Sequence, residues 1–437
     1  MSVLNQVLKS LLEYEKSDKY SNLVLNSKSL DTLSKEERGL FTLIFYSVIE
    51  HKITLDYYIG VISKRQTGEI SPRALLILRI GAAELLYINS IPDYAAVNEC
   101  VSLAKSAGER AFINGVLRTL VREKENLPLP DKNKSLYRYL SVKYSVSRKI
   151  LKLLSASVGE EGLEDYLSAI SSLNYTDISV NLKKTTRDAY LEILLSGGYA
   201  AKKSSYSSLG IRIEGSVNPS ELPYYSEGYF FVQDEASAIL ADVAGISENM
   251  RAVDVCSAPG GKSLALASLS RDTAEIYAFD LRESKLSLIE SSKKRLGFEK
   301  ITVGHLDATK PKAELFSSFD VVLCDVPCSG LGILSKKADM RYKDISGLDE
   351  LPCLQYEILN KSKDYLKNGG TLIYSTCTVN PLENGGVIDR FLLENPEYEK
   401  APFEIGTLKT DGALTLYPNI HKTDGFFICK LRRKVNG

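Results

Sequence analysis

Two cysteines directly follow apolar stretches that are typical of buried strands, and both could act as nucleophiles. Cys328 lies in "DVPCSGLG", after "FDVVLC", and Cys377 lies in "YSTCTV", after "TLIY". Asp325 precedes Cys328 by three residues. The thiolate is the form of cysteine that attacks carbon, and a nearby acid can exchange protons with a substrate. A cysteine near a strand end is more often a small buried hydrophobe, so either thiol alone is weak evidence for catalysis.

A second stretch, "CSAPGGK" (Cys256 to Lys262), has the composition of a ligand-binding turn. Its proline and two glycines make a tight turn in which a ligand can approach backbone N–H groups at the start of a helix. The stretch matches neither the dinucleotide pattern G-x-G-x-x-G nor the phosphate-binding loop. A purely structural turn therefore remains the commoner interpretation of these residues taken alone.

Two further acids end the apolar runs that come next in the chain. Asp280 follows "EIYAF" about 20 residues after the glycine turn, where a carboxylate can accept hydrogen bonds from ribose hydroxyls. Asp307 follows "ITVGHL". Each acid alone could be a helix cap. Together they predict a nucleoside pocket without phosphate-binding machinery, which fits S-adenosylmethionine better than NAD.

Apolar runs alternate with helix-like runs from about residue 250 onward, and this pattern predicts βαβ units in a doubly wound parallel sheet. Ligands of such sheets bind at the carboxyl ends of the strands. We therefore expect Lys262, Asp325, Cys328 and Cys377 to lie along one edge. The last runs, "ALTLYP" and "GFFICKL", have no helix between them and predict an antiparallel edge pair.

The first 128 residues or so predict an all-α unit. "RALLILRIGAAELLYINSIP" has the broad apolar stripe of a buried helix, which we expect Pro92 to close. The run "AAVNECVSLAKSAGERAFINGVLRTLVREKE" predicts two helices with a break near Gly108.

A proline-containing linker, "ENLPLPDKNK", precedes a basic stretch rich in tyrosine. Cations can contact phosphates and tyrosine rings can stack on bases, so this composition suits RNA. A solvated basic helix whose tyrosines pack on the core explains it equally well. Residues from about 155 to 230 predict a small α/β part with a strand at "DISVNLKK". The candidate RNA-binding residues are Lys134, Arg138, Lys143, Arg148 and Lys149.

The composition limits the classes of protein that remain. The chain has 437 residues, enough for about three domains, and 44% hydrophobic residues. Its net charge is zero, so a polyanion must be held by a local patch. Seven scattered cysteines and three histidines argue against a disulfide scaffold or a metal site. We find no membrane span or signal peptide and expect a cytoplasmic monomer.

The motifs "CSAPGGK", "DVPCSG" and "YSTCTVNPLENGGVI" resemble the signatures of the RNA cytosine-5 methyltransferases, the NOL1/NOP2/Sun family, and "FFVQDEASAILA" and "GFFICKL" agree. The N-terminal "IPDYAAVNECVSLAK" and "FINGVLRTLVR" resemble the NusB-like RNA-binding domain. This order of domains is that of the bacterial RsmB subgroup. The resemblance implies a NusB-like domain at 1–128, a connecting RNA-binding region at 129–230 and a class I methyltransferase domain with a Rossmann-like fold at 231–437.

The resemblance also implies a role for each matching residue. Cys377 matches the nucleophile that adds to C6 of cytosine, and Cys328 matches the second cysteine, which helps to resolve the covalent adduct. Asp325 and Lys262 match residues that contact the target base. The matching S-adenosylmethionine-binding residues are Cys256, Ser257, Ala258, Pro259, Gly260, Gly261, Lys262, Asp280, Asp307 and Asp325.

The implied activity is methylation of C5 of a cytosine in 16S ribosomal RNA of the small subunit, with S-adenosylmethionine as methyl donor. The same chemistry on transfer RNA or large-subunit RNA is an alternative. A different class of protein, a non-catalytic RNA-binding assembly factor in which the NusB-like domain dominates, is a second alternative.

Overall fold

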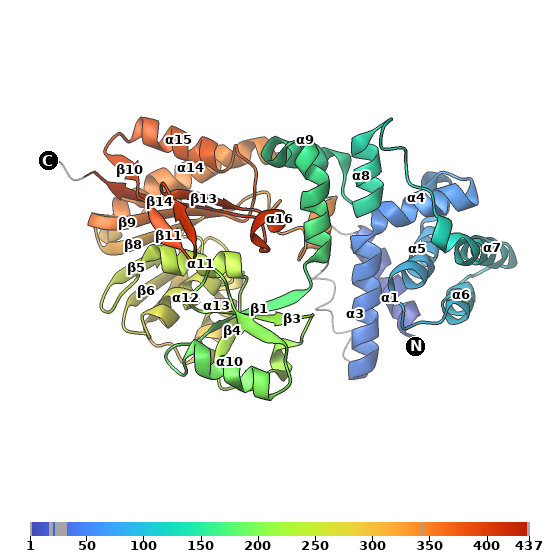
Figure 1. The fold of residues 1–437 in the computed structure, drawn as a ribbon, viewed down its shortest axis with the longest axis horizontal. Helices are drawn as coiled ribbons and strands as arrows, with labels where there is room; N and C mark the ends of the chain where they lie inside the picture. The colour runs from blue at the N-terminus through green and yellow to red at the C-terminus, as the bar shows by residue number, and fades with distance from the viewer. Residues whose placement is uncertain (1, 17–20, 22–32, 343, 435–437) are drawn as a thin grey trace. The chain divides into compact units, whose positions relative to one another are not determined.

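The computed structural model describes residues 2–16, 21, 33–342 and 344–434. Contacts divide the chain into two compact units (Figure 1): Met1–Leu153 with Lys336–Asp344, and Leu154–Ser335 with Ile345–Gly437. The expected order of an all-α part followed by an α/β part is confirmed. The functional boundaries at 128 and 230 stay a prediction, because packing alone groups the residues differently. Within the described residues, none of the helices is long and apolar enough to cross a membrane.

The first unit is a bundle of helices around an apolar core. Its central helix, α5, begins where the Ser71 hydroxyl accepts a hydrogen bond from the Ala74 N–H and Pro72 takes the first position. Every residue of 74–85 is buried, as the broad apolar stripe predicted. The helices are α1 (Val3–Lys16), α3 (Lys35–Glu50), α4 (Lys52–Ser63), α5 (Pro72–Tyr87), α6 (Asp93–Ser102), α7 (Ala107–Glu123) and α8 (Leu136–Tyr144).

The helix ends in this unit differ slightly from those expected. Helix α5 already ends at Tyr87, and Pro92 instead precedes the first residue of α6. The break between α6 and α7 lies at 103–106, just before Gly108. It falls there because the hydroxyl of Ser106 caps α7 by accepting a hydrogen bond from the Glu109 N–H.

A segment from the second half of the sequence packs in the helical unit. Arg341, only 3% exposed, donates to Glu50 Oε1 at 2.7 Å and to the Tyr144 carbonyl at 3.0 Å. The hydroxyl of Tyr342 donates to the Ile49 carbonyl at 2.5 Å. The chain that follows the Cys328 motif is therefore tied to α3 and α8.

Helix α9 (Arg148–Ser172) leads into the second unit and leaves helical geometry at Gly159. A small sheet follows, with strands in the order β2-β3-β1-β4, all antiparallel. Residues from about 155 to 230 were expected to form a small α/β part, and this sheet together with α10 agrees with that expectation. The elements are β1 (Tyr175–Val180), α10 (Arg187–Ser196), β2 (Ala201–Lys203), β3 (Gly210–Glu214) and β4 (Phe230–Val232).

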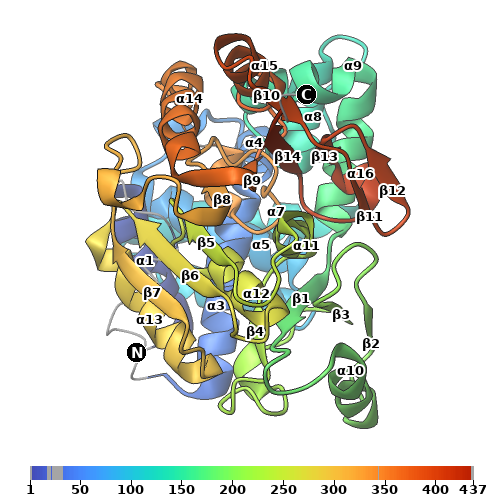
Figure 2. The same ribbon diagram turned by 90° about the vertical axis from the view of Figure 1, so that its left-hand side faces the viewer.

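The main sheet has the strand order β10-β14-β9-β8-β5-β6-β7, and β9, β8, β5, β6 and β7 are parallel (Figure 2). The predicted doubly wound sheet is confirmed. The helices and strands of this part of the chain are α11 (Glu235–Ala244), β5 (Arg251–Asp254), α12 (Gly261–Leu269), β6 (Glu275–Asp280), α13 (Glu283–Leu296), β7 (Ile301–His305), β8 (Phe319–Asp325), α14 (Leu351–Ser362), β9 (Leu366–Thr376), α15 (Gly385–Glu394), β10 (Tyr398–Lys400), β11 (Phe403–Ile405), β12 (Leu408–Thr410), β13 (Ala413–Leu416), α16 (Pro418–His421) and β14 (Phe426–Arg433). Strands β11 and β12 pair with each other in a separate two-stranded sheet.

The central strands are apolar on both faces because helices cover both. In β8, Val321 and Leu323 pack with α11, α12 and α13, whereas Val322 and Cys324 pack with α14 and α15. Alternate residues of one strand thus enter two different cores. This burial on both sides fixes the register of β8, and with it the position of the motif that follows.

Two details of the main sheet depart from expectation. Strand β9 begins at Leu366, so "LKNGG", which precedes the apolar run "TLIY", already belongs to the strand. The antiparallel pairing of β13 with β14 is confirmed, but β14 also pairs with β9 and so joins the parallel strands directly.

Candidate active site

The carboxyl ends of the parallel strands bring the predicted residues to one edge of the main sheet. The loop of 256–260 follows β5, Asp280 ends β6 and Asp325 ends β8. Cys377 directly follows β9. Parallel strands end at the same edge, so register alone gathers these groups from positions far apart in the sequence.

The two candidate thiols are in direct contact. Cys328 Sγ lies 3.1 Å from Cys377 Sγ, and both side chains are partly buried. The hydrogen bond with Cys377, together with burial, raises the pKa of Cys328 well above its ordinary value. Cys328 therefore keeps its proton at neutral pH and can donate it toward the sulfur of Cys377.

An ion pair joins the other two predicted catalytic residues. Lys262 Nζ lies 2.6 Å from Asp325 Oδ2, with side chains 15% and 24% exposed. Ser375 donates to the second oxygen of Asp325 at 2.8 Å, and the ammonium of Lys262 lies 5.3 Å from the centre of the Phe426 ring. Burial would lower the pKa of Lys262, but attraction by Asp325 outweighs it and raises the pKa; Cys377 adds in the same direction. A fixed cation thus faces the thiol that is expected to ionise.

Glu383, which we did not single out from the sequence, holds the two cysteine loops together. Its side chain is fully buried and accepts hydrogen bonds from the Ser329 N–H at 2.8 Å, from Gln355 Nε2 at 2.9 Å and from Asn380 Nδ2 at 2.9 Å. Gln355 also donates to the carbonyl of Pro327 at 2.9 Å. The signal was present in the sequence, since an acid inside "VNPLENGG" interrupts an otherwise neutral stretch.

Asp280 organises the glycine turn. Its carboxylate accepts from the Ala258 N–H at 3.0 Å and from the Arg282 N–H at 2.9 Å. Gly260 has φ +109°, and a Cβ there would lie 3.2 Å from Ile289, so both backbone conformation and space require glycine. The turn ends as α12 begins at Gly261. The N-terminus of α12 therefore points its N–H groups toward this edge of the sheet.

Asp254 lies beneath the same turn and is completely buried. It accepts hydrogen bonds from the Ser263 hydroxyl at 2.8 Å and from the Cys256 N–H at 3.4 Å. Burial raises its pKa to about 7. Asp254 thus connects the end of β5 to α12 and fixes the base of the turn.

The turn contains donors that the protein itself does not use. Across the described chain, the buried atoms without a hydrogen-bond partner include Ser257 Oγ and Gln233 Nε2. Gln233 is held through its other side-chain atom, Oε1, which accepts from the Ser179 hydroxyl at 2.9 Å. Its Nε2 would be 3.5 Å from a Cβ on Gly261. Unused buried donors beside a helix N-terminus fit a polar, partly anionic ligand such as the methionine part of S-adenosylmethionine.

Asp307 and Pro259 also belong to the predicted cofactor-binding residues. Asp307 follows β7 and is bonded within its own turn, to the Thr309 hydroxyl at 2.6 Å and to Lys310 at 3.1 Å. The hydrogen bond from Thr309 lowers the pKa of Asp307, so it is a carboxylate at neutral pH. Pro259 is exposed in the glycine turn. In the described residues no group of three or more His, Cys, Asp or Glu side chains could hold a metal ion.

The basic stretch forms α8 and the start of α9. Its five candidate residues are all exposed. The tyrosines among them are only partly buried, and Lys143 Nζ lies 5.4 Å and 5.2 Å from the rings of Tyr139 and Tyr144. The structure therefore leaves this surface accessible, and binding of RNA there stays a prediction.

Comparison with known families defines the class of protein. A family model described as "16S rRNA methyltransferase RsmB/F" matches residues 243–432, which include both thiols and the glycine turn. A model described as "NusB family" matches residues 1–122, the helical part. The chain is therefore a methyltransferase with a NusB-type N-terminal domain, in agreement with the resemblance of its motifs.

Individual relatives specify the family. The chain is 33% identical over 450 residues to the "Probable ribosomal RNA small subunit methyltransferase B" of Bacillus subtilis, with 99% of each chain covered. It is 31% identical to the protein described in the same words from Synechocystis, with 97% of each covered. A solved methyltransferase homologue from Pyrococcus horikoshii superposes with a TM-score of 0.60 at 26% identity and covers 69% of this chain and 99% of its own. The chain belongs to the ribosomal RNA small subunit methyltransferase B family.

Proposed function

We propose that this protein transfers a methyl group from S-adenosylmethionine to C5 of a cytosine in 16S ribosomal RNA, through a covalent adduct with Cys377. The names of its relatives support the ribosomal RNA of the small subunit as substrate. The observation that carries the proposed chemistry is the pair of thiols 3.1 Å apart, beside the ion pair of Lys262 with Asp325.

The chemistry of cytosine explains why a thiol is needed. C5 is too weak a nucleophile to attack a methyl sulfonium by itself. Addition of a thiolate to C6 converts the ring into an enamine-like nucleophile at C5, and later loss of the C5 proton allows the thiolate to leave. Such a site needs a thiol that can ionise, a group that stabilises the ring as it accepts electrons, and a route for protons.

Cys377 is the thiol best placed to ionise. The ammonium of Lys262 stabilises negative charge on its sulfur, and Cys328, whose pKa is raised, can donate its S–H to that sulfur. The proposed mechanism needs one thiol to carry the charge while the other keeps its proton, and the short distance between the two sulfurs supports such a pair. We propose that Asp325, at the end of β8, contacts the base and, when it carries a proton, donates it to N3, where negative charge develops after addition.

Cys328 has its main role at the end of the reaction. When the Cys377 sulfur leaves C6 it regains negative charge, and the S–H of Cys328 can stabilise that charge as it forms. A protein without this thiol should form the adduct and then release it slowly.

The residues around the glycine turn fit the methyl donor. The carboxylates of Asp280 and Asp307 can accept hydrogen bonds from its hydroxyl and amino groups, and the unused donors of Ser257 and Gln233 can bind its carboxylate. S-adenosylmethionine, when bound, supplies an electrophilic methyl group. Cys256, Ala258, Pro259, Gly260 and Gly261 form the turn that shapes this pocket.

The target cytosine has to be unstacked, because a stacked base hides C6 from a thiol at a sheet edge. We propose that the exposed basic residues of α8 and α9 bind phosphates of the RNA, since a protein with zero net charge needs a local patch for this purpose.

Covalent trapping tests the proposal. Fluorine at C5 prevents loss of the C5 substituent as a proton, so RNA containing 5-fluorocytosine should stay attached to the protein. Cys377→Ala should form no adduct, Cys328→Ala should accumulate an adduct even with ordinary RNA, and Cys353→Ala, at an exposed thiol on α14, should behave as the unaltered protein. An adduct that survives Cys377→Ala but not Cys328→Ala would reverse the two roles.

Two further measurements define the substrate. Radiolabelled S-adenosylmethionine with small-subunit RNA should give incorporation of label; tight RNA binding without incorporation would favour an assembly factor. Bisulfite sequencing of ribosomal and transfer RNA from cells without this protein should show loss of one modified cytosine in 16S RNA. A loss confined to transfer RNA or large-subunit RNA would assign the same chemistry to that substrate.

A further inference from the structure

Three backbone segments that are far apart in the sequence are bonded in series behind Cys377. The N–H of Gly332, four residues after Cys328, donates to the Cys377 carbonyl at 3.0 Å. The N–H of Gly425, which directly precedes β14, donates to the Gly332 carbonyl at 2.8 Å. The backbone at the proposed nucleophile is therefore bonded to the loop of its partner thiol, and that loop to the turn before β14.

Space, and not backbone conformation, requires glycine at both positions. A Cβ on Gly332 would lie 1.9 Å from the Gly425 carbonyl oxygen and 2.9 Å from that of Cys377. A Cβ on Gly425 would lie 2.7 Å from the Gly332 Cα and 2.8 Å from Val379 Cγ1. Neither glycine has a positive φ. The atoms that a side chain would meet are mostly backbone, which cannot rotate away.

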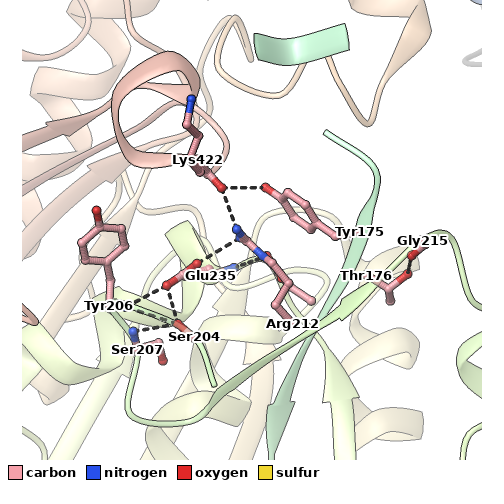
Figure 3. Close-up of polar contacts among 10 residues, drawn as sticks. Tyr175, Thr176, Ser204, Tyr206, Ser207, Arg212, Gly215, Glu235 and Lys422 are labelled. Carbon is pink, nitrogen blue, oxygen red and sulfur yellow. Dashed lines mark hydrogen bonds and ion pairs between the residues drawn. The ribbon is translucent and has the colours of Figure 1, made fainter. Parts of the chain in front are cut away.

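The outer end of the turn is held by a partly buried arginine (Figure 3). Arg212 Nη1, on β3, donates to the Lys422 carbonyl at 2.7 Å. The same guanidinium donates to both oxygens of Asp177, at 2.8 Å and 3.0 Å, and to Glu235 at 2.9 Å, and it stacks 3.6 Å from the Tyr175 ring centre. A planar group fixed on four sides leaves little freedom for the carbonyl it binds.

The turn has one more contact with each side of the site. Asp424, 2% exposed, accepts a hydrogen bond from Ser335 at 2.6 Å, which ties the far end of the Cys328 loop. Phe426, next to Gly425, presents its ring to Lys262. The turn of residues 422–425 thus contacts the loop of Cys328 directly and reaches the backbone of Cys377 only through Gly332. It is followed directly by Phe426, whose ring lies against Lys262.

We propose that the turn of residues 422–425, anchored by Arg212, positions the Cys377 nucleophile through Gly332 and Gly425, which are positioning residues for the reaction. The small sheet of β1–β4 thereby acts on catalysis through the backbone and without touching the reacting atoms. The inference rests on the proposed function for the role of Cys377, although the geometry of the two thiols can be measured without it.

The expected effect follows from the distances. Ordinary van der Waals contact needs about 3.4 Å or more, so a methyl group on Gly332 must push the turn and the Cys377 segment apart by about an ångström or more. A misplacement of about 1 Å between reacting groups can cost about 10²-fold in rate. Gly332→Ala should therefore slow attack on C6 by about that factor.

The first test measures thiol geometry alone, in a Cys353→Ala background without the exposed thiol. Oxidised glutathione takes two electrons and two protons from Cys328 and Cys377, forming one disulfide and two molecules of reduced glutathione. Gly332→Ala should lower the equilibrium constant of this exchange at least about tenfold, because disulfide geometry is strict. Gly162→Ala in α9, where a Cβ makes only ordinary contacts, is the matched control and should leave the constant unchanged.

The second test measures the rate of adduct formation with RNA containing 5-fluorocytosine. Gly332→Ala should slow it about 10²-fold while the dissociation constants of S-adenosylmethionine and RNA stay within about twofold of the unaltered protein. Arg212→Lys is the milder variant to use if Gly332→Ala does not fold, because it keeps the charge beside Asp177 and Glu235 but loses the planar fork that reaches the Lys422 carbonyl. It should change both readouts in the same direction.

The outcomes separate the two proposals. Folded Gly332→Ala with an unchanged disulfide equilibrium and an unchanged adduct rate overturns the positioning role. An unaltered protein that forms no adduct with RNA, while Gly332→Ala still shifts the disulfide equilibrium, refutes the proposed function and leaves the geometric inference standing.

Discussion

Replacing Asp254 by asparagine should remove a pH dependence from the stability of the catalytic unit. Asp254 is completely buried at the end of β5, and burial raises its pKa from 3.8 to about 7. The folded chain therefore binds this proton more tightly than the unfolded chain does. The contribution of this proton to the free energy of unfolding is fully present below about pH 4 and is lost as the pH rises through about 7.

The magnitude follows from the two pKa values. Between pH 5 and pH 8, proton linkage at a carboxyl whose pKa rises from 3.8 to about 7 reduces the free energy of unfolding by about 3 kcal/mol. Asparagine does not titrate, and its amide can keep both contacts, because one atom accepts from the Cys256 N–H and the other can donate to the Ser263 hydroxyl. Relative to the unaltered protein, the free energy of unfolding of Asp254→Asn should therefore increase by about 3 kcal/mol as the pH rises from 5 to 8.

Urea titrations of both proteins at pH 5 and pH 8, followed by circular dichroism, measure this difference. Other buried titrating groups, such as Glu84 and His51, occur in both proteins and cancel when the two are subtracted. A difference between the proteins that stays constant within about 0.5 kcal/mol across this range would show that Asp254 is charged in the folded state, and the reasoning from burial would fail.

Three further outcomes are expected. Glu383→Ala should lower the free energy of unfolding by about 3–6 kcal/mol in urea titrations, because it leaves three buried donors without an acceptor. Glu383→Gln should lower it less, and an equal loss in the two variants would contradict the role of Glu383 as acceptor. Gly260→Ala should raise the dissociation constant of S-adenosylmethionine about tenfold by calorimetry, since φ is +109° and the new Cβ would crowd Ile289; unchanged affinity would place the methyl donor elsewhere. Changing the five exposed basic residues of 134–149 to glutamine should flatten the salt dependence of RNA binding by about 0.7 in slope per lost phosphate contact, and an unchanged slope would assign them to a solvated surface.

The sequence predicted the doubly wound sheet and the edge at which the site lies, because both follow from local patterns. Apolar runs that alternate with helical runs require a parallel sheet, and parallel strands must end together. Asp280, Asp325, Cys328 and Cys377 could therefore be assigned to one edge from their places after apolar runs. The glycine turn was recognisable from its composition, and the family from its motifs.

Contacts between distant segments could not be predicted in this way. Nothing near Cys328 in the sequence indicates that Glu383 accepts from the N–H of Ser329, or that Gly425 lies against Gly332. No pattern in the sequence assigns Arg341 to the helical unit, yet in the structure it packs there against Glu50 and Tyr144. Each of these contacts joins residues that are far apart in the sequence, and no repeating pattern of residue types along the chain indicates that they meet.

The sequence by itself determined the class of reaction, because its motifs resemble those of a known methyltransferase family. Only the tertiary structure decided the protonation and the positions of these groups. The charge on Lys262, the proton on Cys328 and the position of Cys377 depend on distances of about 3 Å between segments that are far apart in the sequence. Electrostatic and hydrogen-bonding energies change steeply over such distances, so they are fixed by packing and not by order along the chain.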